Sequence, residues 1–151
     1  MKGYWLRFTN TFFRDITTVG GTVFYLLVLI STFLLDEKIV AFKLVLGFLF
    51  SFLIIVLIRL FYFKNRPQKE KYHTFPERIE ASSFPSWHTA RALFLALLFG
   101  SMGPSRTISI FLIILAVLVM YSRIFLKKHD GIDVLGGIVL GVITFWITTL
   151  L

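Results

Sequence analysis

A polar stretch from Ser122 to Asp133, with the sequence SRIFLKKHDGID, lies between two apolar runs and carries residues that could do chemistry. His129 and Asp133 are four residues apart, so on a helix their side chains would share a face and could touch. A carboxylate that holds one ring nitrogen of a histidine leaves the other as an oriented base or nucleophile. Arg123, six residues before His129, would supply a fixed positive charge. Together these groups indicate chemistry on an anionic group.

Two other segments carry residue types that suit the same chemistry. Arg59 and Arg66 are seven residues apart near the end of an apolar run, and arginine is suited to bidentate binding of phosphate oxygens. Ser86, Trp87 and His88 stand at the start of another apolar run, where the free backbone N–H groups of a helix can hold an anion. With two histidines available, one can attack while the other acts as an acid.

The composition indicates that the solvent of this chain is lipid. Of its 151 residues, 57% are hydrophobic and only 16% are charged, and the mean hydropathy is +0.83. The net charge of +8 would indicate nucleic-acid binding in a water-soluble protein. Because no basic soluble segment is present to carry that function, lipid headgroups or an anionic substrate are the expected partners. The absence of cysteine excludes disulfides, thiol catalysis and cysteine-based metal sites.

The apolar pattern predicts the elements that must position these residues. Five apolar segments cover residues 18–35, 39–63, 89–102, 107–126 and 131–151. A spanning helix needs roughly 20 apolar residues, so the third segment is short and could begin inside a polar site. Trp5, Phe8, Phe12 and Ile16 follow helical spacing, which predicts an amphipathic helix in the membrane interface over residues 1–17 and argues against a signal peptide; a frayed tail is the alternative.

The predicted fold class is therefore all-α: a polytopic integral-membrane bundle of about five transmembrane helices plus an N-terminal interfacial helix. We expect a single membrane domain over residues 1–151, with the transmembrane core at 18–151. Alternating the segments across the bilayer places the N-terminus, the connection 64–88 and the stretch 122–133 on one face. The turns at 36–38 and 103–106 and the C-terminus fall on the other face.

Small residues suggest which helices approach closely. Ala92, Ala96 and Gly100 recur every four residues, and Gly137 and Gly141 form a GxxxG pattern. Small side chains let helix backbones approach in lipid. The hypothesis is that the third and fifth apolar helices pack together and bring the two histidines side by side. The alternative is that these small residues face lipid or other helices.

Taken together, the polar segments resemble the three signature motifs of the type 2 phosphatidic acid phosphatase superfamily of membrane lipid phosphatases. That family's third motif is Ser-Arg-x5-His-x3-Asp, and every fixed position is matched, by Ser122, Arg123, His129 and Asp133.

The other two motifs are matched with one departure each. In the second motif, Pro-Ser-Gly-His, Trp87 replaces the glycine, while Pro85, Ser86 and His88 match. In the first, Lys-x6-Arg-Pro, Arg59 replaces the lysine, while Arg66 and Pro67 match. Arginine keeps the charge of lysine but not its geometry.

The resemblance implies a role for each matched residue. His129 would be the nucleophile that forms a phosphohistidine, Asp133 would orient it, and His88 would protonate the leaving oxygen. Relatives do this without a metal, so no cofactor is expected. The phosphate would be held by Arg59, Arg66, Arg123, Ser86 and the backbone N–H of Trp87. Arg91 and Ser122 are candidates for supporting contacts behind these groups, and Arg91 could instead pair with a carboxylate.

Polar residues outside the motifs have simpler interpretations. His73 is expected to be a solvated loop residue, and Asp130 a helix cap or a solvated residue. A basic rim facing the headgroups is expected from Lys64, Lys69, Lys71, Arg78, Lys127 and Lys128. A role of this rim in selecting a polyanionic substrate is the weaker interpretation.

The expected function is hydrolysis of a phosphate from a lipid headgroup. Candidate substrates are the 1-phosphate of lipid A, phosphatidylglycerophosphate, undecaprenyl diphosphate and phosphatidic acid, with a slight preference for lipid A because of the basic rim. The compact frame resembles small bacterial lipid A 1-phosphatases and phosphatidylglycerophosphate phosphatases. The alternatives are a vanadate-dependent haloperoxidase and a non-enzymatic membrane scaffold or transport subunit that binds anionic lipid. Neither nucleic acid nor an obligate protein partner is expected.

Two arguments about membrane orientation disagree. The face that carries the motifs holds 13 of the 16 lysines and arginines, and the other face holds Lys38, Lys43 and Arg106. The positive-inside rule would place the motifs in the cytoplasm. The resemblance instead implies a site on the outer face of a bacterial inner membrane, since bacterial relatives generally place it there. We favour the resemblance, because part of the positive charge is expected to serve the substrate.

Overall fold

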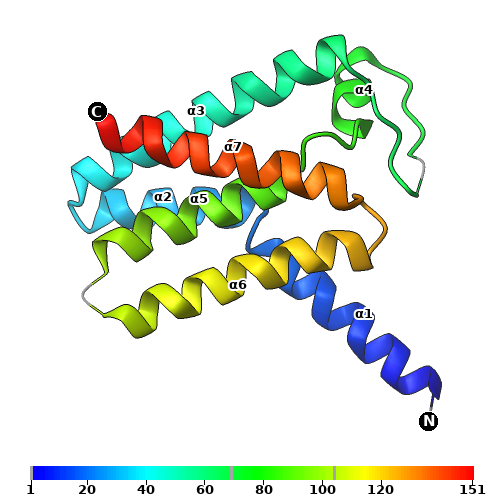
Figure 1. The fold of residues 1–151 in the computed structure, drawn as a ribbon, viewed down its shortest axis with the longest axis horizontal. Helices are drawn as coiled ribbons and strands as arrows, with labels where there is room; N and C mark the ends of the chain where they lie inside the picture. Colours follow the sequence, from blue (N-terminus) through cyan, green and yellow to red (C-terminus); the bar gives the residue numbers. More distant parts are fainter. Residues whose placement is uncertain (1, 69, 104) are drawn as a thin grey trace.

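The computed structural model describes residues 2–68, 70–103 and 105–151, so Lys69 of the expected rim and Pro104 of the second turn lie outside the described residues. Within these ranges the chain is all-α, as predicted (Figure 1). The helices are α1 (Lys2–Thr18), α2 (Thr22–Leu34), α3 (Lys38–Phe61), α4 (Phe75–Ala81), α5 (Trp87–Met102), α6 (Arg106–Phe125) and α7 (Gly131–Leu150).

Among the described residues, α3, α6 and α7 are long and apolar enough to cross a bilayer. The helices α1 and α2 meet the same criterion only together, as a pair bent by 44°. Large apolar side chains on the spanning helices point away from the bundle, and Leu49, Phe111, Leu135 and Trp146 are each more than half exposed. Side chains of this size on an outer surface indicate contact with lipid. The protein is therefore an integral-membrane helical bundle, as its composition predicts.

The short helix α5 lies at the centre of the bundle, as Figure 1 shows. Toward α2 and α3 it contributes Phe94 and Leu98 to a buried cluster with Tyr25 and Leu44. The Tyr25 hydroxyl satisfies its hydrogen-bonding requirement in this apolar setting by donating to the Leu44 carbonyl at 2.7 Å. Because neighbours cover α5 on several sides, its 16 residues need not form a lipid-facing span.

The third and fifth apolar helices of the sequence, α5 and α7, do pack together. A Cβ atom on Gly137 would lie 2.6 Å from the Ser86 carbonyl oxygen, and one on Gly141 would lie 2.8 Å from that of Ala90. The GxxxG pattern thus allows the close approach that was expected.

The small face of α5 has a different partner from the one expected. Ala92 and Ala96 pack in a cluster with Ala116 and Val119 of α6, and Gly100 faces Ser109. Hence the two small-residue patterns serve two separate interfaces of α5, one with α6 and one with α7.

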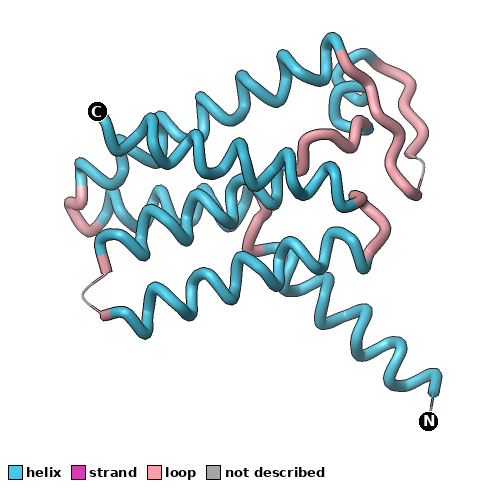
Figure 2. The backbone as a smooth tube through the Cα atoms, viewed as in Figure 1, coloured by secondary structure: helices cyan, strands magenta, loops and turns pink. Residues whose placement is uncertain are grey.

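Apart from the bend between α1 and α2, the connections lie toward the two ends of the bundle (Figure 2). The long connection after α3, expected from sequence to be a loop, contains α4. Thr74 and Glu77 form a reciprocal capping box at its start, and Pro76 lies in its first turn. This Thr-x-x-Glu pattern with a proline is a recognised helix-start signal, so α4 could have been predicted from sequence.

Candidate active site

A cavity of about 600 Å³ opens at the end of the bundle where α5 begins. Its charged or titratable lining residues are Arg59, Arg66, Arg91, Arg123, Glu80, His88 and His129. Its other lining residues come from α3, α4 and the starts of α2 and α5, and they are Phe52, Ile55, Val56, Phe75, Pro76, Ile79, Thr22 and Trp87. The three sequence motifs therefore converge on one cavity that is lined by both cationic and apolar side chains.

His129 is positioned by the way the chain leaves α6. The backbone N–H groups of Lys128 and His129 both donate to the Arg123 carbonyl, at 3.1 and 3.2 Å. Lys127 adopts a left-handed backbone conformation with φ of 54°, which ends the helix and reverses the chain. As a result, the backbone of His129 lies against the last turn of α6, and its side chain is 2% exposed.

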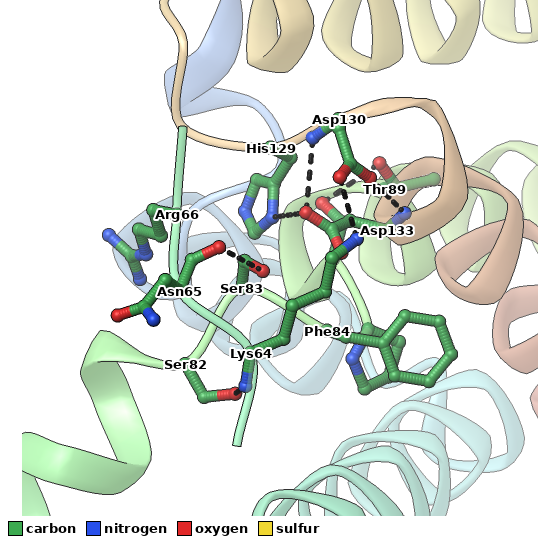
Figure 3. A network of polar contacts seen from close by, with 12 residues as sticks. Lys64, Asn65, Arg66, Ser82, Ser83, Phe84, Thr89, His129, Asp130 and Asp133 are labelled. Carbon is green, nitrogen blue, oxygen red and sulfur yellow. Dashed lines mark hydrogen bonds and ion pairs between the residues drawn. The ribbon is translucent and has the colours of Figure 1, made fainter. Parts of the chain in front are cut away.

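Asp133 lies behind His129, as the spacing predicts. Its Oδ2 is 3.6 Å from Nδ1 of His129, as Figure 3 shows. This contact is slightly longer than a hydrogen bond, and it becomes an ion pair when the imidazole is protonated. Catalytic pairs often tighten only when the substrate is bound. With Nδ1 facing Asp133, Nε2 is the ring nitrogen left for chemistry.

Lys64 belongs to this carboxylate network and not to the solvated rim, which corrects the expectation from sequence. Its Nζ donates to Asp130 Oδ2 at 2.6 Å and to Asp133 Oδ1 at 2.8 Å (Figure 3). Asp130 caps α7 by accepting a hydrogen bond from the Asp133 N–H. A helix cap was one of the two roles expected for it, the other being a solvated residue. Burial alone would lower the pKa of Lys64, but the hydrogen bonds to both aspartates outweigh burial and raise it.

The segment that delivers Lys64 and Arg66 to the site is held by two buried serines. The Ser83 N–H donates to the Lys64 carbonyl at 2.8 Å, and its hydroxyl donates to the Asn65 carbonyl at 3.3 Å (Figure 3). The Lys64 N–H in turn donates to Ser82 Oγ at 3.2 Å. These contacts join the first motif to the residues just before the second.

Arg66 is held by a second ion-pair network at the mouth of the cavity. Its Nη1 donates to Glu70 at 2.6 Å, and its Nη2 donates to the Glu80 carbonyl at 2.7 Å. Lys128 donates to the other oxygen of Glu70 at 2.7 Å. Lys128 is therefore paired, whereas Lys71, Arg78 and Lys127 are exposed as the rim prediction expects. His73 is exposed as well.

Arg59, which replaces the lysine of the family pattern, donates to main-chain carbonyls. Its Nε and Nη2 reach the carbonyls of Phe84 and Pro85, at 3.3 and 3.0 Å. Its Nη1 reaches those of Ile79 and Glu80, at 3.1 and 3.5 Å. One planar guanidinium thus holds the end of α4 and the entrance to α5, which a lysine could not do with the same geometry.

Two threonines from the N-terminal part of the chain hold the remaining arginines. Arg123 Nη1 donates to Thr17 at 3.0 Å, and Arg91 Nη1 donates to Thr22 at 2.8 Å. These threonines flank the bend between α1 and α2. At Gly20 in the bend, a Cβ atom would lie 2.6 Å from the His88 carbonyl oxygen, so only glycine allows this approach. Sequence reasoning missed these contacts, and no motif signals them.

The serines of the second and third motifs lie behind the cavity wall. Ser86 is fully buried; its Oγ accepts from the Thr89 hydroxyl at 3.0 Å, and its N–H donates to the Asp133 carbonyl at 2.9 Å. Ser122 is also fully buried and donates to the Val119 carbonyl at 2.6 Å. Trp87 is the first residue of α5, where the backbone N–H has no partner within the helix.

The electrostatic setting of His129 favours its neutral form. Burial lowers the pKa of His129 below its ordinary value, and the positive charges of Arg123 and Arg66 lower it further, although Asp133 opposes them. A neutral imidazole with one nitrogen held by a carboxylate is a nucleophile or a base. The arginines nearby would stabilise the negative charge of a transferring phosphoryl group.

The chain is similar to known proteins in both sequence and fold. The family model described as "PAP2 superfamily" matches residues 40–151. Over 90 residues, or 58% of the chain, the sequence is 39% identical to "Undecaprenyl-diphosphatase BcrC" from Bacillus subtilis (strain 168). That match covers 45% of the relative, so it spans less than half of the relative's length.

Two crystal structures have a similar fold over nearly the whole chain. Aquifex aeolicus LpxE is similar with a TM-score of 0.78 and 26% identity, over 95% of this chain and 87% of that one. The first transmembrane PAP2 type phosphatidylglycerolphosphate phosphatase from Bacillus subtilis is similar with a TM-score of 0.76 and 24% identity, over 94% and 75%. The second likeness, at its low identity, concerns the fold alone.

The carbonyl contacts of Arg59 predict the effect of restoring lysine at this position. The Arg59→Lys variant should lower the free energy of unfolding by about 1–3 kcal/mol, because a lysine ammonium cannot reach all of these carbonyls at once. The expected observation is a melting temperature several degrees lower in detergent. Arg7→Lys on the exposed face of α1 is the control and should melt like the original protein. Equal melting of both variants would contradict a holding role for Arg59.

Proposed function

The chain belongs to the PAP2 superfamily, and from this premise we propose that it is an integral-membrane lipid phosphatase acting through a phosphohistidine without a metal. The observation that carries the proposal is the single cavity that holds His129, His88, Arg66 and Arg123, with Asp133 behind His129. Its apolar lining residues suit a lipid tail, while its arginines suit a phosphate headgroup.

In the proposed mechanism, Nε2 of His129 attacks the phosphorus, and the bond to the leaving oxygen breaks. Asp133 keeps the proton on Nδ1 and stabilises the charge that develops on the ring. His88 donates a proton to the leaving oxygen, which departs with the lipid. Water then attacks the phosphohistidine and releases inorganic phosphate, with His88 as the base.

Cations and backbone donors would hold the phosphate oxygens in this mechanism. Arg66 and Arg123 line the cavity beside the histidines, and the N–H of Trp87 starts α5 there. Arg59 also lines the cavity and adds its charge, but its nitrogens already donate to carbonyls. Ser86, whose hydroxyl bonds Thr89, would contribute by fixing the start of α5 and by its link to Asp133.

The candidate lipids remain those expected from sequence. The similarity to an undecaprenyl-diphosphatase supports undecaprenyl diphosphate. The 1-phosphate of lipid A, phosphatidylglycerophosphate and phosphatidic acid are the other candidates.

The links from Thr17 and Thr22 to the site arginines support treating residues 1–151 as one functional domain.

The nucleophile assignment predicts a complete loss of turnover in one variant. His129→Gln should lower phosphate release from a lipid phosphate in detergent by at least about a thousandfold, because glutamine cannot form a phosphohistidine. The matched control is His73→Gln, at an exposed loop position, which should keep the original rate. Release by His129→Gln at a rate near that of the control would refute the assignment.

The position of Lys64 predicts a change in pH dependence. His129 must be neutral to attack, so activity is lost as the pH falls through its pKa, which lies below the ordinary histidine value. In the Lys64→Met variant, no ammonium offsets the negative charge of Asp133. The carboxylate then favours protonated His129 more strongly, which raises the pKa of His129. The acidic limb of kcat/KM should therefore move to higher pH.

Lys71→Met, at an exposed position, is the control for this measurement and should keep the original profile. A Lys64→Met enzyme that is slower at every pH, with an unmoved acidic limb, would show that Lys64 acts only on local structure.

We further propose that the site faces the periplasm or the cell exterior. The chain has no native cysteine, so single-cysteine variants report orientation directly. In intact cells, Lys71→Cys near the site should react with a membrane-impermeant maleimide. Lys38→Cys, at the exposed turn on the opposite end of the bundle, should react only after permeabilisation. The reverse pattern would place the site in the cytoplasm.

A further inference from the structure

Arg91 is a buried cation that the proposed mechanism does not use. It lies one helical turn beyond His88 on α5, is 2% exposed, and lines the same cavity. No carboxylate lies within ion-pair distance of it among the described residues. A buried charge that lacks a counterion is costly, so its retention needs an explanation.

The free edge of this guanidinium is the edge that recognises anions. Nη1 donates to Thr22, while Nε and Nη2 are buried without hydrogen-bond partners. These two nitrogens form the side of the guanidinium that pairs bidentately with phosphate or carboxylate. In Arg59, by contrast, the same pair of nitrogens is taken by two carbonyls.

Aromatic packing fixes the orientation of Arg91 and adds a donor. Its Cζ lies 3.9 Å from the centroid of Trp87 and 5.4 Å from that of Phe48. Stacking engages the face of the guanidinium and leaves its N–H groups in the plane free to donate. The indole Nε1 of Trp87 is also buried without a partner. Three unpaired N–H donors therefore belong to two stacked side chains in the cavity wall.

The depth of Arg91 in the site indicates which anion these donors take. Arg91 lies about 4.5 Å further along α5 than His88, toward the interior of the bundle. A lipid bound with its distal phosphate at His129 would have its next headgroup atoms on that side.

We propose that Arg91, with the Trp87 indole, forms a second anion subsite that binds the lipid-proximal phosphate of a lipid diphosphate. This rests on the proposed phosphatase function and specifies its substrate class. His129 attacks the distal phosphorus, and the bond from that phosphorus to the bridging oxygen breaks. The bridging oxygen leaves with the lipid monophosphate, whose phosphate stays at Arg91. Water then cleaves the phosphohistidine to give inorganic phosphate.

The test compares a polyprenyl diphosphate with the polyprenyl monophosphate of the same tail, in detergent. The original protein should prefer the diphosphate. Arg91→Met, which keeps an unbranched aliphatic stem but removes the guanidinium, should lower the ratio of the two kcat/KM values at least tenfold, mainly through KM for the diphosphate. Arg91→Lys, which keeps the charge but loses the paired donors, should recover only part of this ratio. Equal losses on both substrates, or an unchanged ratio, would overturn the subsite.

A binding measurement separates the subsite from effects on turnover. In a His129→Gln background, inorganic pyrophosphate should raise the melting temperature more than inorganic phosphate does. Adding Arg91→Met should remove that difference; persistence of the difference would overturn the subsite. Failure of the proposed function would give a different result. The original protein would then release phosphate from the two lipids no faster than His129→Gln does.

Discussion

The structure of this site depends on holding four guanidinium groups in the wall of one cavity at the end of a membrane bundle. Like charges repel strongly where water is scarce, and each group also loses hydration. The four arginines are held in three ways. Arg59 donates to main-chain carbonyls, Arg66 pairs with Glu70, and Arg123 and Arg91 donate to threonines of the N-terminal bend. Because few carboxylates neutralise these charges, the cavity retains a strong preference for anions.

The two aspartates, Asp130 and Asp133, lie by Lys64, and Asp133 also faces His129. Asp133 is fully buried behind His129, and its two oxygens face different partners, the imidazole and Lys64. Lys64 thereby limits how strongly Asp133 can favour the protonated imidazole. Because Lys64 also shares Asp130 with the cap of α7, the start of that helix and the charge state of His129 are linked.

Much of the architecture could be predicted from sequence, because lipid imposes long apolar runs with polar ends. The segment expected at 107–126 is the helix α6 (Arg106–Phe125), and the segment expected at 131–151 is α7 (Gly131–Leu150). The convergence of His88 and His129 on one cavity also followed from motif spacing and topology. What sequence could not provide are contacts between distant segments with no local pattern, such as Arg123 with Thr17 across 106 residues. Lys64 was missed for the same reason, since only the folded chain brings it to Asp133.

The way Arg59 holds α4 has a consequence for the evolution of the protein. All of its acceptors are main-chain oxygens, which every amino acid possesses, so the contact does not depend on the side chains of the segment it fixes. Phe75 and Ile79 on that segment line the cavity. Substitutions at these two positions can therefore reshape the cavity lining while the backbone path stays the same. In this way, α4 can vary to suit a different lipid tail without changing its contacts with Arg59.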